Sequence, residues 1–163
     1  MVAGLRERAW DAAATVVDPE IPVLTIADLG VLRDVTVAGD GTLDVLITPT
    51  YSGCPAMNII ALEVGLALQR AGLPAARVRT VLSPAWTTDW MTDEGRRKLR
   101  DYGIAPPPPP GTGRGALFGT PAVACPVCGS ADTEQLSEFG STSCKSLWRC
   151  KSCREPFDHF KCH

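Results

Sequence analysis

Histidine is almost absent from this chain of 163 residues. Its two histidines, His159 and His163, both stand at the C-terminal end, so a histidine-activated nucleophile elsewhere would need the tail to reach it. No Glu-x-x-His pair occurs, which excludes the ligand motif of a di-iron oxygenase. A glycine fingerprint for flavin or nicotinamide binding is also missing. These absences indicate an accessory protein rather than an enzyme in its own right.

The chain also lacks a strong excess of charge and a long apolar run. Sixteen lysine and arginine residues stand against 18 aspartate and glutamate residues, for a formal net charge of −2. A basic surface for nucleic acid is therefore not indicated. The apolar segment 59–68 contains Glu63 and is too short to span a bilayer. Because the first ten residues carry charge where a secretory signal is apolar, we expect a cytoplasmic protein without a membrane partner.

Cysteine, by contrast, occurs seven times, and four of the seven form two Cys-x-x-Cys pairs near the C-terminus. Each pair places two thiolates on a tight turn, and two such turns supply the corners of a tetrahedral zinc site. The odd number of cysteines also favours metal ligation over a disulfide framework in a reducing compartment. We therefore predict a structural zinc site in a module over residues 121–163, with the ligands Cys125, Cys128, Cys150 and Cys153.

Several alternatives stay open for this tail. Cys144 or Cys162 could replace one of the four ligands, and thiolate sets also hold iron. The turn 125–129 resembles a rubredoxin knuckle, but the dense aromatic shell around a rubredoxin iron is lacking, which favours zinc. Residues 121–163 carry five basic and five acidic side chains, so we expect the module to dock a partner protein rather than nucleic acid.

The hydrophobic pattern before the tail predicts an α+β fold, a small α/β sandwich with a mixed sheet and helices on one face. The expected order α-β-β-α-β-α comprises a helix 3–16, strands 31–37 and 43–48, a helix 55–71, a strand 78–82 and a helix 93–102. A right-handed crossover through the second helix would make the last two strands parallel. We predict this domain over 1–105, a Pro/Gly linker over 106–120 and a zinc-ribbon-like β module over 121–163.

Cys54 stands apart from the tail cysteines, after the second predicted strand. Pro55 suits the first turn of a helix, so the helix dipole and free N–H groups should lie close to the thiol and lower its pKa. Hydroxyl groups at positions 48 and 50–52 crowd the same turn, so an anion or a metal centre could be held there. The alternative is an inert, buried cysteine in a strand–helix turn.

Two further groups of residues attract attention. Asp18 and Glu20 lie in a proline-rich loop and either border the Cys54 site or are solvated turn residues. Trp86 and Trp90 follow the third strand, where core packing explains one tryptophan and two indicate a contact surface.

The segments 18–24, 28–30, 48–55 and 82–90 resemble the iron–sulfur assembly domain shared by SufT-like proteins and eukaryotic cytosolic cluster-targeting factors. The longer pattern adds 95–99, 102–106, 137–142, 144–145 and 157–162. With these additions the chain is similar to the D subunits of bacterial phenylacetyl-CoA epoxidase (ring 1,2-epoxidase) systems, the PaaD family. The resemblance covers nearly the whole chain except the first residues and the linker.

This resemblance implies a role in aerobic phenylacetate catabolism and aromatic degradation, where a di-iron oxygenase epoxidises the ring of phenylacetyl-CoA. The D subunit would help to assemble a metal centre, either the reductase's iron–sulfur cluster or the oxygenase's di-iron site, so both subunits are expected partners. By motif, Cys54 carries over as the reactive or cluster-binding cysteine and Asp18 as the acidic residue of the opening motif. Whether two copies pair as a homodimer stays open.

Three hypotheses follow for the function. In the first, Cys54 transiently holds iron or an iron–sulfur cluster and the tail docks the client enzyme. In the second, the chain is a thiol-redox protein in which Cys54 exchanges with Cys144 or Cys162. In the third, it is a purely structural, zinc-bearing subunit of the oxygenase complex.

Overall fold

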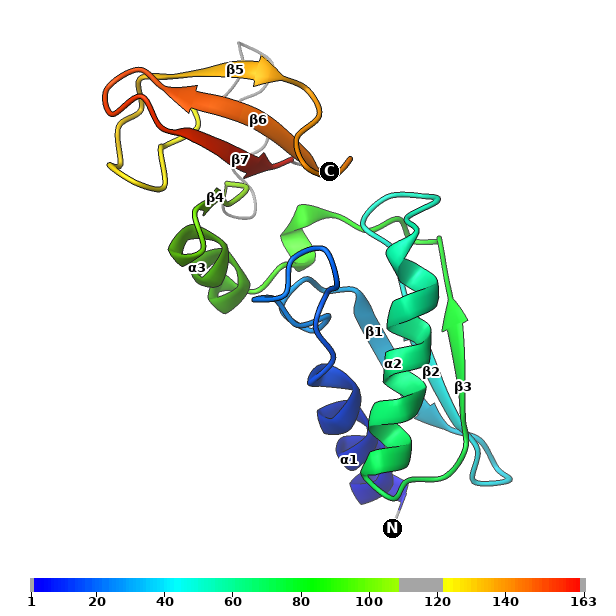
Figure 1. Ribbon diagram of the computed structural model, residues 1–163. Helices are drawn as coiled ribbons and strands as arrows, with labels where there is room; N and C mark the ends of the chain where they lie inside the picture. The colour runs from blue at the N-terminus through cyan, green and yellow to red at the C-terminus, as the bar shows by residue number, and fades with distance from the viewer. Residues whose placement is uncertain (1, 109–121, 162–163) are drawn as a thin grey trace. The chain divides into compact units, whose positions relative to one another are not determined.

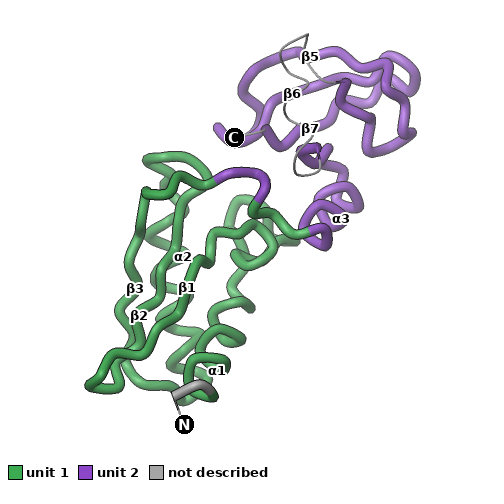
Figure 2. Tube along the Cα trace, turned by 180° about the vertical axis from the view of Figure 1, so that it is seen from behind, with its two compact units in different colours: residues 1–86, 90–92 green, residues 87–89, 93–163 purple. Residues whose placement is uncertain are grey.

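The computed structural model describes residues 2–108 and 122–161, with the side chains of residues 2 and 3 left aside. The chain forms two compact units, one of residues 1–86 and 90–92 and the other of residues 87–89 and 93–163 (Figure 2). Each unit contains its own β-sheet (Figure 1). Most of the predicted linker 106–120, and the residues Cys162 and His163, lie outside the described part of the chain.

The first unit has the predicted mixed sheet. In chain order it contains α1 (Val2–Ala14), β1 (Leu32–Val37), β2 (Leu43–Ile47), α2 (Ala56–Arg70) and β3 (Ala76–Thr80). The strands lie in the order β1-β2-β3, with β1 antiparallel and β3 parallel to β2. The α+β fold and the parallel last pair are thus confirmed. The connection through α2 is what allows β3 to run parallel to β2.

The core of this unit lies between the sheet and the helices α1 and α2, which cover the same face of the sheet (Figure 1). Along β2, Leu43, Val45 and Ile47 are buried, because alternate side chains of a strand point to one face. From α2, Ile60 and Val64 are buried one helical turn apart. Each such side chain stabilises the fold by about 1.5–3 kcal/mol relative to exposure.

The loop after α1 packs against the segment that follows β3, and this contact depends on Gly30. Gly30 has a φ of +73°, and a Cβ atom there would lie 2.5 Å from the Trp90 carbonyl oxygen. The Trp86 indole Nε1 donates a hydrogen bond to the Leu29 carbonyl (2.8 Å), and Trp86 is buried. The Arg33 guanidinium covers the Trp90 ring at 3.4 Å. Trp86 therefore belongs to the core, and Trp90 serves packing within the unit.

The second unit carries a four-stranded sheet. A short 3₁₀ turn, η1 (Thr88–Trp90), has residues in both units. The second unit then contains α3 (Asp93–Asp101), β4 (Ile104–Ala105), β5 (Thr133–Ser137), β6 (Lys145–Cys150) and β7 (Pro156–Phe160). The strand order is β4-β7-β6-β5, with β4 parallel to β7 and the other pairs antiparallel. The predicted β module is thus present. In the structure α3 and β4 group with it, whereas the predicted domain boundary follows residue 105.

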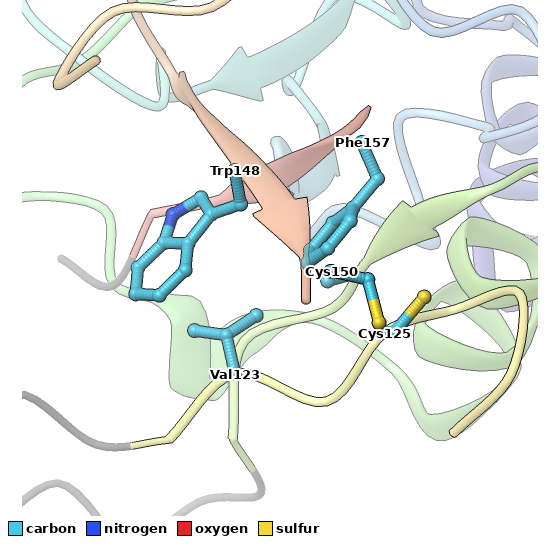
Figure 3. Close-up of a cluster of buried hydrophobic side chains, with 6 residues drawn as sticks. Val123, Cys125, Trp148, Cys150 and Phe157 are labelled. Carbon is cyan, nitrogen blue, oxygen red and sulfur yellow. The ribbon is translucent and has the colours of Figure 1, made fainter. Parts of the chain in front are cut away.

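A small hydrophobic cluster lies beneath the cysteine turns of this unit. It consists of Ala105, Val123, Cys125, Trp148, Cys150 and Phe157 (Figure 3). The Trp148 Nε1 group is satisfied by the Ser146 hydroxyl at 2.9 Å. Two of the predicted metal ligands are therefore also core residues, so that the cysteine site and the core of this unit are built together.

Candidate functional site

The four tail cysteines lie together in the structure. Their Sγ atoms are all within 4.8 Å of one another. Two close pairs join the two turns, with 3.7 Å between the sulfurs of Cys125 and Cys153 and 3.5 Å between those of Cys128 and Cys150. Two thiolates bound at about 2.3 Å to a tetrahedral zinc ion would be separated by about 3.8 Å. The separations of the four sulfurs are therefore close to those around a tetrahedral zinc ion.

The two turns that carry these cysteines have the same backbone design. Cys125 N–H donates to the Ser130 carbonyl (2.9 Å) and Cys150 N–H donates to the Glu155 carbonyl (3.0 Å), in each case five residues later. The fourth residue after the first cysteine is left-handed in both turns, Gly129 with a φ of +77° and Arg154 with a φ of +67°. A repeated local geometry thus aims both pairs of thiols at a common point.

Hydrogen bonds and neighbouring thiols set the proton affinities of the cysteines in the second turn. The backbone N–H of Cys153 donates to Cys150 Sγ (3.4 Å), and this bond is the main reason that the pKa of Cys150 falls to about 6. The pKa of Cys153 rises to about 12: a backbone hydrogen bond from Glu155 opposes the rise, but desolvation and the adjacent thiols outweigh it. The Cys150 thiol therefore loses its proton more readily than the Cys153 thiol.

The donor set identifies the kind of metal site that these residues can form. Four thiols from the protein fill a tetrahedral shell and leave no coordination position for water or substrate. Such closed sites stabilise a fold, whereas catalytic zinc sites keep one position open. Within the described residues, the group of close ligand atoms contains neither a histidine nor a carboxylate. The geometry therefore fits a structural site rather than a catalytic one.

The alternative ligands are not brought to this cluster where the structure describes them. Cys144 directly precedes β6 and Cys150 ends it, so about 20 Å of extended strand separate the two. Cys144 is buried, with its sulfur 3.0 Å from the Thr142 hydroxyl. His159 lies with Nδ1 3.1 Å from the Ala105 carbonyl, and burial lowers its pKa. The cluster of sulfurs thus consists of the two Cys-x-x-Cys pairs.

Cys54 lies in the first unit, in the turn between β2 and α2. Its N–H donates to the Tyr51 carbonyl and its carbonyl accepts from Met57 N–H, both at 3.3 Å. Pro55 is the N-cap residue of α2, with helical dihedral angles, so Cys54 stands one residue before the cap. The side chain is partly exposed, as a residue that contacts a ligand or a client would need to be.

The expected lowering of the Cys54 pKa is wrong. Burial of the thiol raises its pKa, and the negative charges of Glu20 and Asp18 add to this effect. The Ala56 N–H at the start of α2 and the Tyr51 side chain act in the opposite direction but do not compensate. The prediction considered the helix terminus alone, whereas partial desolvation and two carboxylates from a distant loop decide the sign.

Asp18 holds its loop in place and also contributes to the field at Cys54. It is buried, and its Oδ1 atom accepts hydrogen bonds from the N–H groups of Glu20 (2.7 Å) and Ile21 (2.9 Å). These bonds fix the carboxylate in the turn that follows α1. The loop thus supplies two acidic groups that act electrostatically on Cys54.

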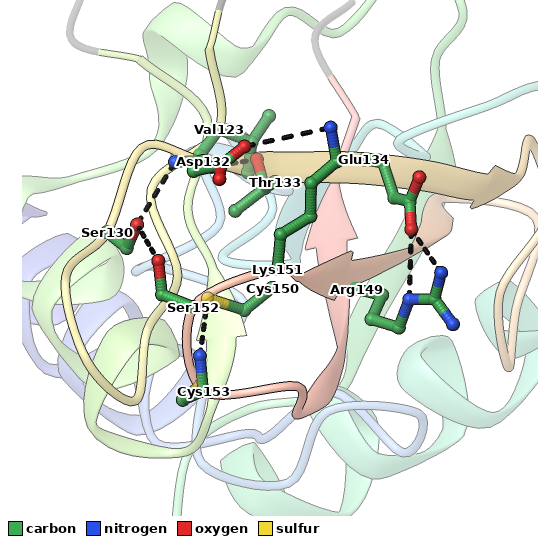
Figure 4. Close-up of polar contacts among 10 residues, drawn as sticks. All are labelled: Val123, Ser130, Asp132, Thr133, Glu134, Arg149, Cys150, Lys151, Ser152 and Cys153. Carbon is green, nitrogen blue, oxygen red and sulfur yellow. Dashed lines mark hydrogen bonds and ion pairs between the residues drawn. The ribbon is translucent and has the colours of Figure 1, made fainter.

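Sequence reasoning missed the polar contacts that join the two cysteine turns. The hydroxyl oxygens of Ser130 and Ser152 lie 2.8 Å apart, and Lys151 contacts Asp132 (Figure 4). In the sequence, only the position of these residues beside or within the Cys-x-x-Cys pairs pointed to such contacts. Polar residues in turns are usually solvated, so their presence alone does not predict a contact.

Two family models match this chain, and each of them includes one of the two cysteine sites. A model of an iron–sulfur cluster assembly protein family matches residues 6–83, which include Asp18 and Cys54. A model of the PaaD zinc beta ribbon domain matches residues 109–161, which include all four cysteines of the cluster. The chain is 51% identical over 153 residues to the Escherichia coli (strain K12) protein named as the D subunit of a "Putative 1,2-phenylacetyl-CoA epoxidase", covering 94% of this chain and 90% of that relative. The chain belongs to the PaaD family.

Shorter relatives match a little over half of this PaaD-family chain. The Bacillus subtilis (strain 168) protein named "Fe-S protein maturation auxiliary factor YitW" is 40% identical over 95 residues, 56% of this chain and 90% of that protein. A crystal structure of a domain of unknown function, DUF59, from Bacillus anthracis superimposes with a TM-score of 0.56. At 24% identity, over 60% of this chain and 92% of the other, it supports the fold alone. Among the described residues, none of the helices combines the length and the apolar character that a membrane span requires.

Proposed function

We propose that this PaaD-family protein is an accessory factor that helps to assemble an iron–sulfur or di-iron centre in a phenylacetyl-CoA epoxidase system. The names of its relatives support this role: one is called a subunit of that epoxidase and another an iron–sulfur protein maturation factor. In this proposal the oxygenase and reductase subunits are the clients. The protein catalyses no epoxidation itself, and Cys54 transiently binds the iron or cluster that is delivered.

The observation that carries the proposal is the partly exposed Cys54 thiol in the field of two carboxylates. Since partial burial and the charges of Glu20 and Asp18 raise its pKa, Cys54 carries its proton at neutral pH when no cation is present. An iron cation would displace that proton to solvent as the sulfur–iron bond forms. The two carboxylates would stabilise the added positive charge.

The same electrostatics favour release of the cargo. A site that restores a neutral thiol when iron leaves does not need to hold the metal permanently. Iron binds both sulfur and carboxylate oxygen ligands, so Asp18 is a second candidate ligand beside Cys54. The four tail cysteines would hold zinc in a separate, structural role, and the module that they stabilise would dock the client.

Replacing Cys54 with serine tests this proposal. We expect oxygenase and reductase subunits produced with the Cys54→Ser protein to contain less iron and to epoxidise more slowly than those produced with the wild type. Cys144→Ser is the matched control, because Cys144 is buried and lies outside both cysteine sites. Fully loaded, active client enzymes from the Cys54→Ser strain would refute the role of Cys54 in assembly.

A purely structural, zinc-bearing subunit is the second candidate function. The raised pKa of Cys54 favours it, because a protonated thiol is a poor nucleophile and a poor ligand. The two candidates differ in anaerobic titration with Fe(II). Assembly predicts sulfur-to-iron charge-transfer absorption that is lost in Cys54→Ser, whereas the structural candidate predicts equal spectra.

Thiol trapping during turnover tests the redox alternative, since only that function predicts a mixed disulfide at Cys54.

A further inference from the structure

The two cysteine turns are joined by polar contacts as well as by their sulfurs. The Ser130 and Ser152 hydroxyl oxygens lie 2.8 Å apart. Lys151 N–H donates to the Asp132 carbonyl (2.9 Å), and Lys151 Nζ lies 3.7 Å from Asp132 Oδ1. Figure 4 shows these four residues between the turns. We call the contacts of Ser130, Asp132, Lys151 and Ser152 the inter-turn link.

Each side of the inter-turn link is anchored directly to a pair of cysteines. Ser130 belongs to the first turn, because its carbonyl accepts a hydrogen bond from Cys125 N–H. Its hydroxyl oxygen accepts from Asp132 N–H (3.1 Å), which helps to orient the hydroxyl that Ser152 contacts. Lys151 and Ser152 are the two residues between Cys150 and Cys153. The link therefore connects the two turns that supply the sulfurs, in addition to the pairing of β5 with β6.

We propose that the inter-turn link positions the two cysteine turns for metal binding and thereby raises the affinity of the site for zinc. When a metal ion binds two turns that move independently, the cost of ordering the turns weakens the binding. Contacts that already hold the turns in register reduce this cost. Groups outside the ligand shell that orient ligands commonly change metal affinity by 10- to 100-fold. Ser152 is accordingly a positioning residue, and its hydroxyl acts on the metal through the turn.

Ser152→Ala is the informative variant, because it removes the bond between the turns and leaves the Asp132–Ser130 hydrogen bond intact. In the full-length protein we expect zinc affinity, measured by competition with a chelator, to fall about 3- to 10-fold. The double variant Lys151→Ala/Ser152→Ala should lose about 10- to 100-fold. Ser152→Thr keeps a hydroxyl and should restore wild-type affinity. Cobalt-substituted proteins should all show the same four-thiolate spectrum at saturation.

Glu134→Gln is the matched control for general stability. It removes the exposed pairing of Glu134 with Arg149 on the same two strands, β5 and β6, without touching the turns. The proposal expects little change in zinc affinity for this variant. Unchanged affinity in Ser152→Ala would overturn the proposal. So would a loss that Ser152→Thr does not restore and that Glu134→Gln reproduces, because the residue would then only stabilise the sheet.

Discussion

The two units of this protein use cysteine in different ways. In the first unit, a mixed sheet and two helices bury a hydrophobic core, and the lone Cys54 takes no part in holding it together. In the second unit, Cys125 and Cys150 belong to both the small core and the sulfur cluster. A unit with a sufficient core can expose a thiol for other purposes. A unit with a small core needs its thiols for its own fold.

The local environments of Cys54 and Cys150 also shift the pKa values of these two thiols in opposite directions. Burial and the carboxylates of Glu20 and Asp18 raise the pKa of Cys54. Backbone N–H groups lower the pKa of Cys150 to about 6. The surroundings of Cys54 therefore favour the neutral thiol, whereas those of Cys150 favour the thiolate.

Removing the metal should produce the largest difference between the two units. Structural zinc contributes about 10–16 kcal/mol to small zinc-dependent domains. We expect a strong chelator, or Cys150→Ser, to unfold the second unit and leave the first one folded. Amide resonances from each unit in a two-dimensional NMR spectrum measure this directly. A spectrum in which both units unfold together would show that they are not independent.

Gly30→Ala should have the opposite effect, because it should destabilise the first unit rather than the second. The added Cβ would lie 2.5 Å from the Trp90 carbonyl oxygen, in a left-handed backbone conformation. We expect a loss of about 2–4 kcal/mol in the free energy of unfolding, with the zinc content unchanged. Gly41→Ala is the control, because Gly41 is also left-handed but has open space around it. It should cost about 1 kcal/mol, and equal losses in denaturant titrations would argue against the steric explanation.

The pH dependence of Cys54 alkylation compares the two kinds of thiol. Because its pKa is raised, the thiolate of Cys54 should form only above the usual pH range of a cysteine, while zinc-bound tail cysteines stay protected. The same shift means that the folded state favours the protonated thiol. This contribution is full below the unfolded pKa and is lost as pH rises through the folded value.

Glu20→Gln sharpens this prediction. Removing the negative charge should lower the pKa of Cys54 and increase its alkylation rate at a fixed, mildly alkaline pH, as measured by peptide mass spectrometry. Glu63→Gln, on α2, is a control of equal charge change. If the two variants react at the same rate, the local carboxylate is not what raises the pKa.

The smallest predicted effects concern the matching left-handed residues of the two cysteine turns. Gly129 suits this conformation, whereas Arg154 adopts it with a side chain. Arg154→Gly should therefore stabilise the zinc-loaded second unit by about 0.5–1 kcal/mol, and Gly129→Ala should destabilise it by about 1 kcal/mol. Thermal unfolding of the zinc-loaded proteins measures both changes. If Arg154→Gly is destabilised instead, the Arg154 side chain stabilises the unit by more free energy than its left-handed backbone conformation costs.

Much of the fold could be read from local patterns. The helix predicted over 55–71 is α2 (Ala56–Arg70), and the strand predicted over 43–48 is β2 (Leu43–Ile47). Alternation and helical spacing predict such elements because each reports which face of a single segment is buried. The grouping of α3 and β4 with the second unit was not visible, since β4 is two residues long and its partner β7 lies more than 50 residues away.

The sequence by itself determined which elements form and which cysteines can reach one another across a tight turn, because both depend on residues a few positions apart. Only the tertiary structure decided how each thiol behaves. The carboxylates that act on Cys54 come from a loop more than 30 residues earlier, and the hydroxyls that join the cysteine turns are 22 residues apart. Electrostatic and hydrogen-bonding environments depend on distance in space, which spacing along the chain does not report.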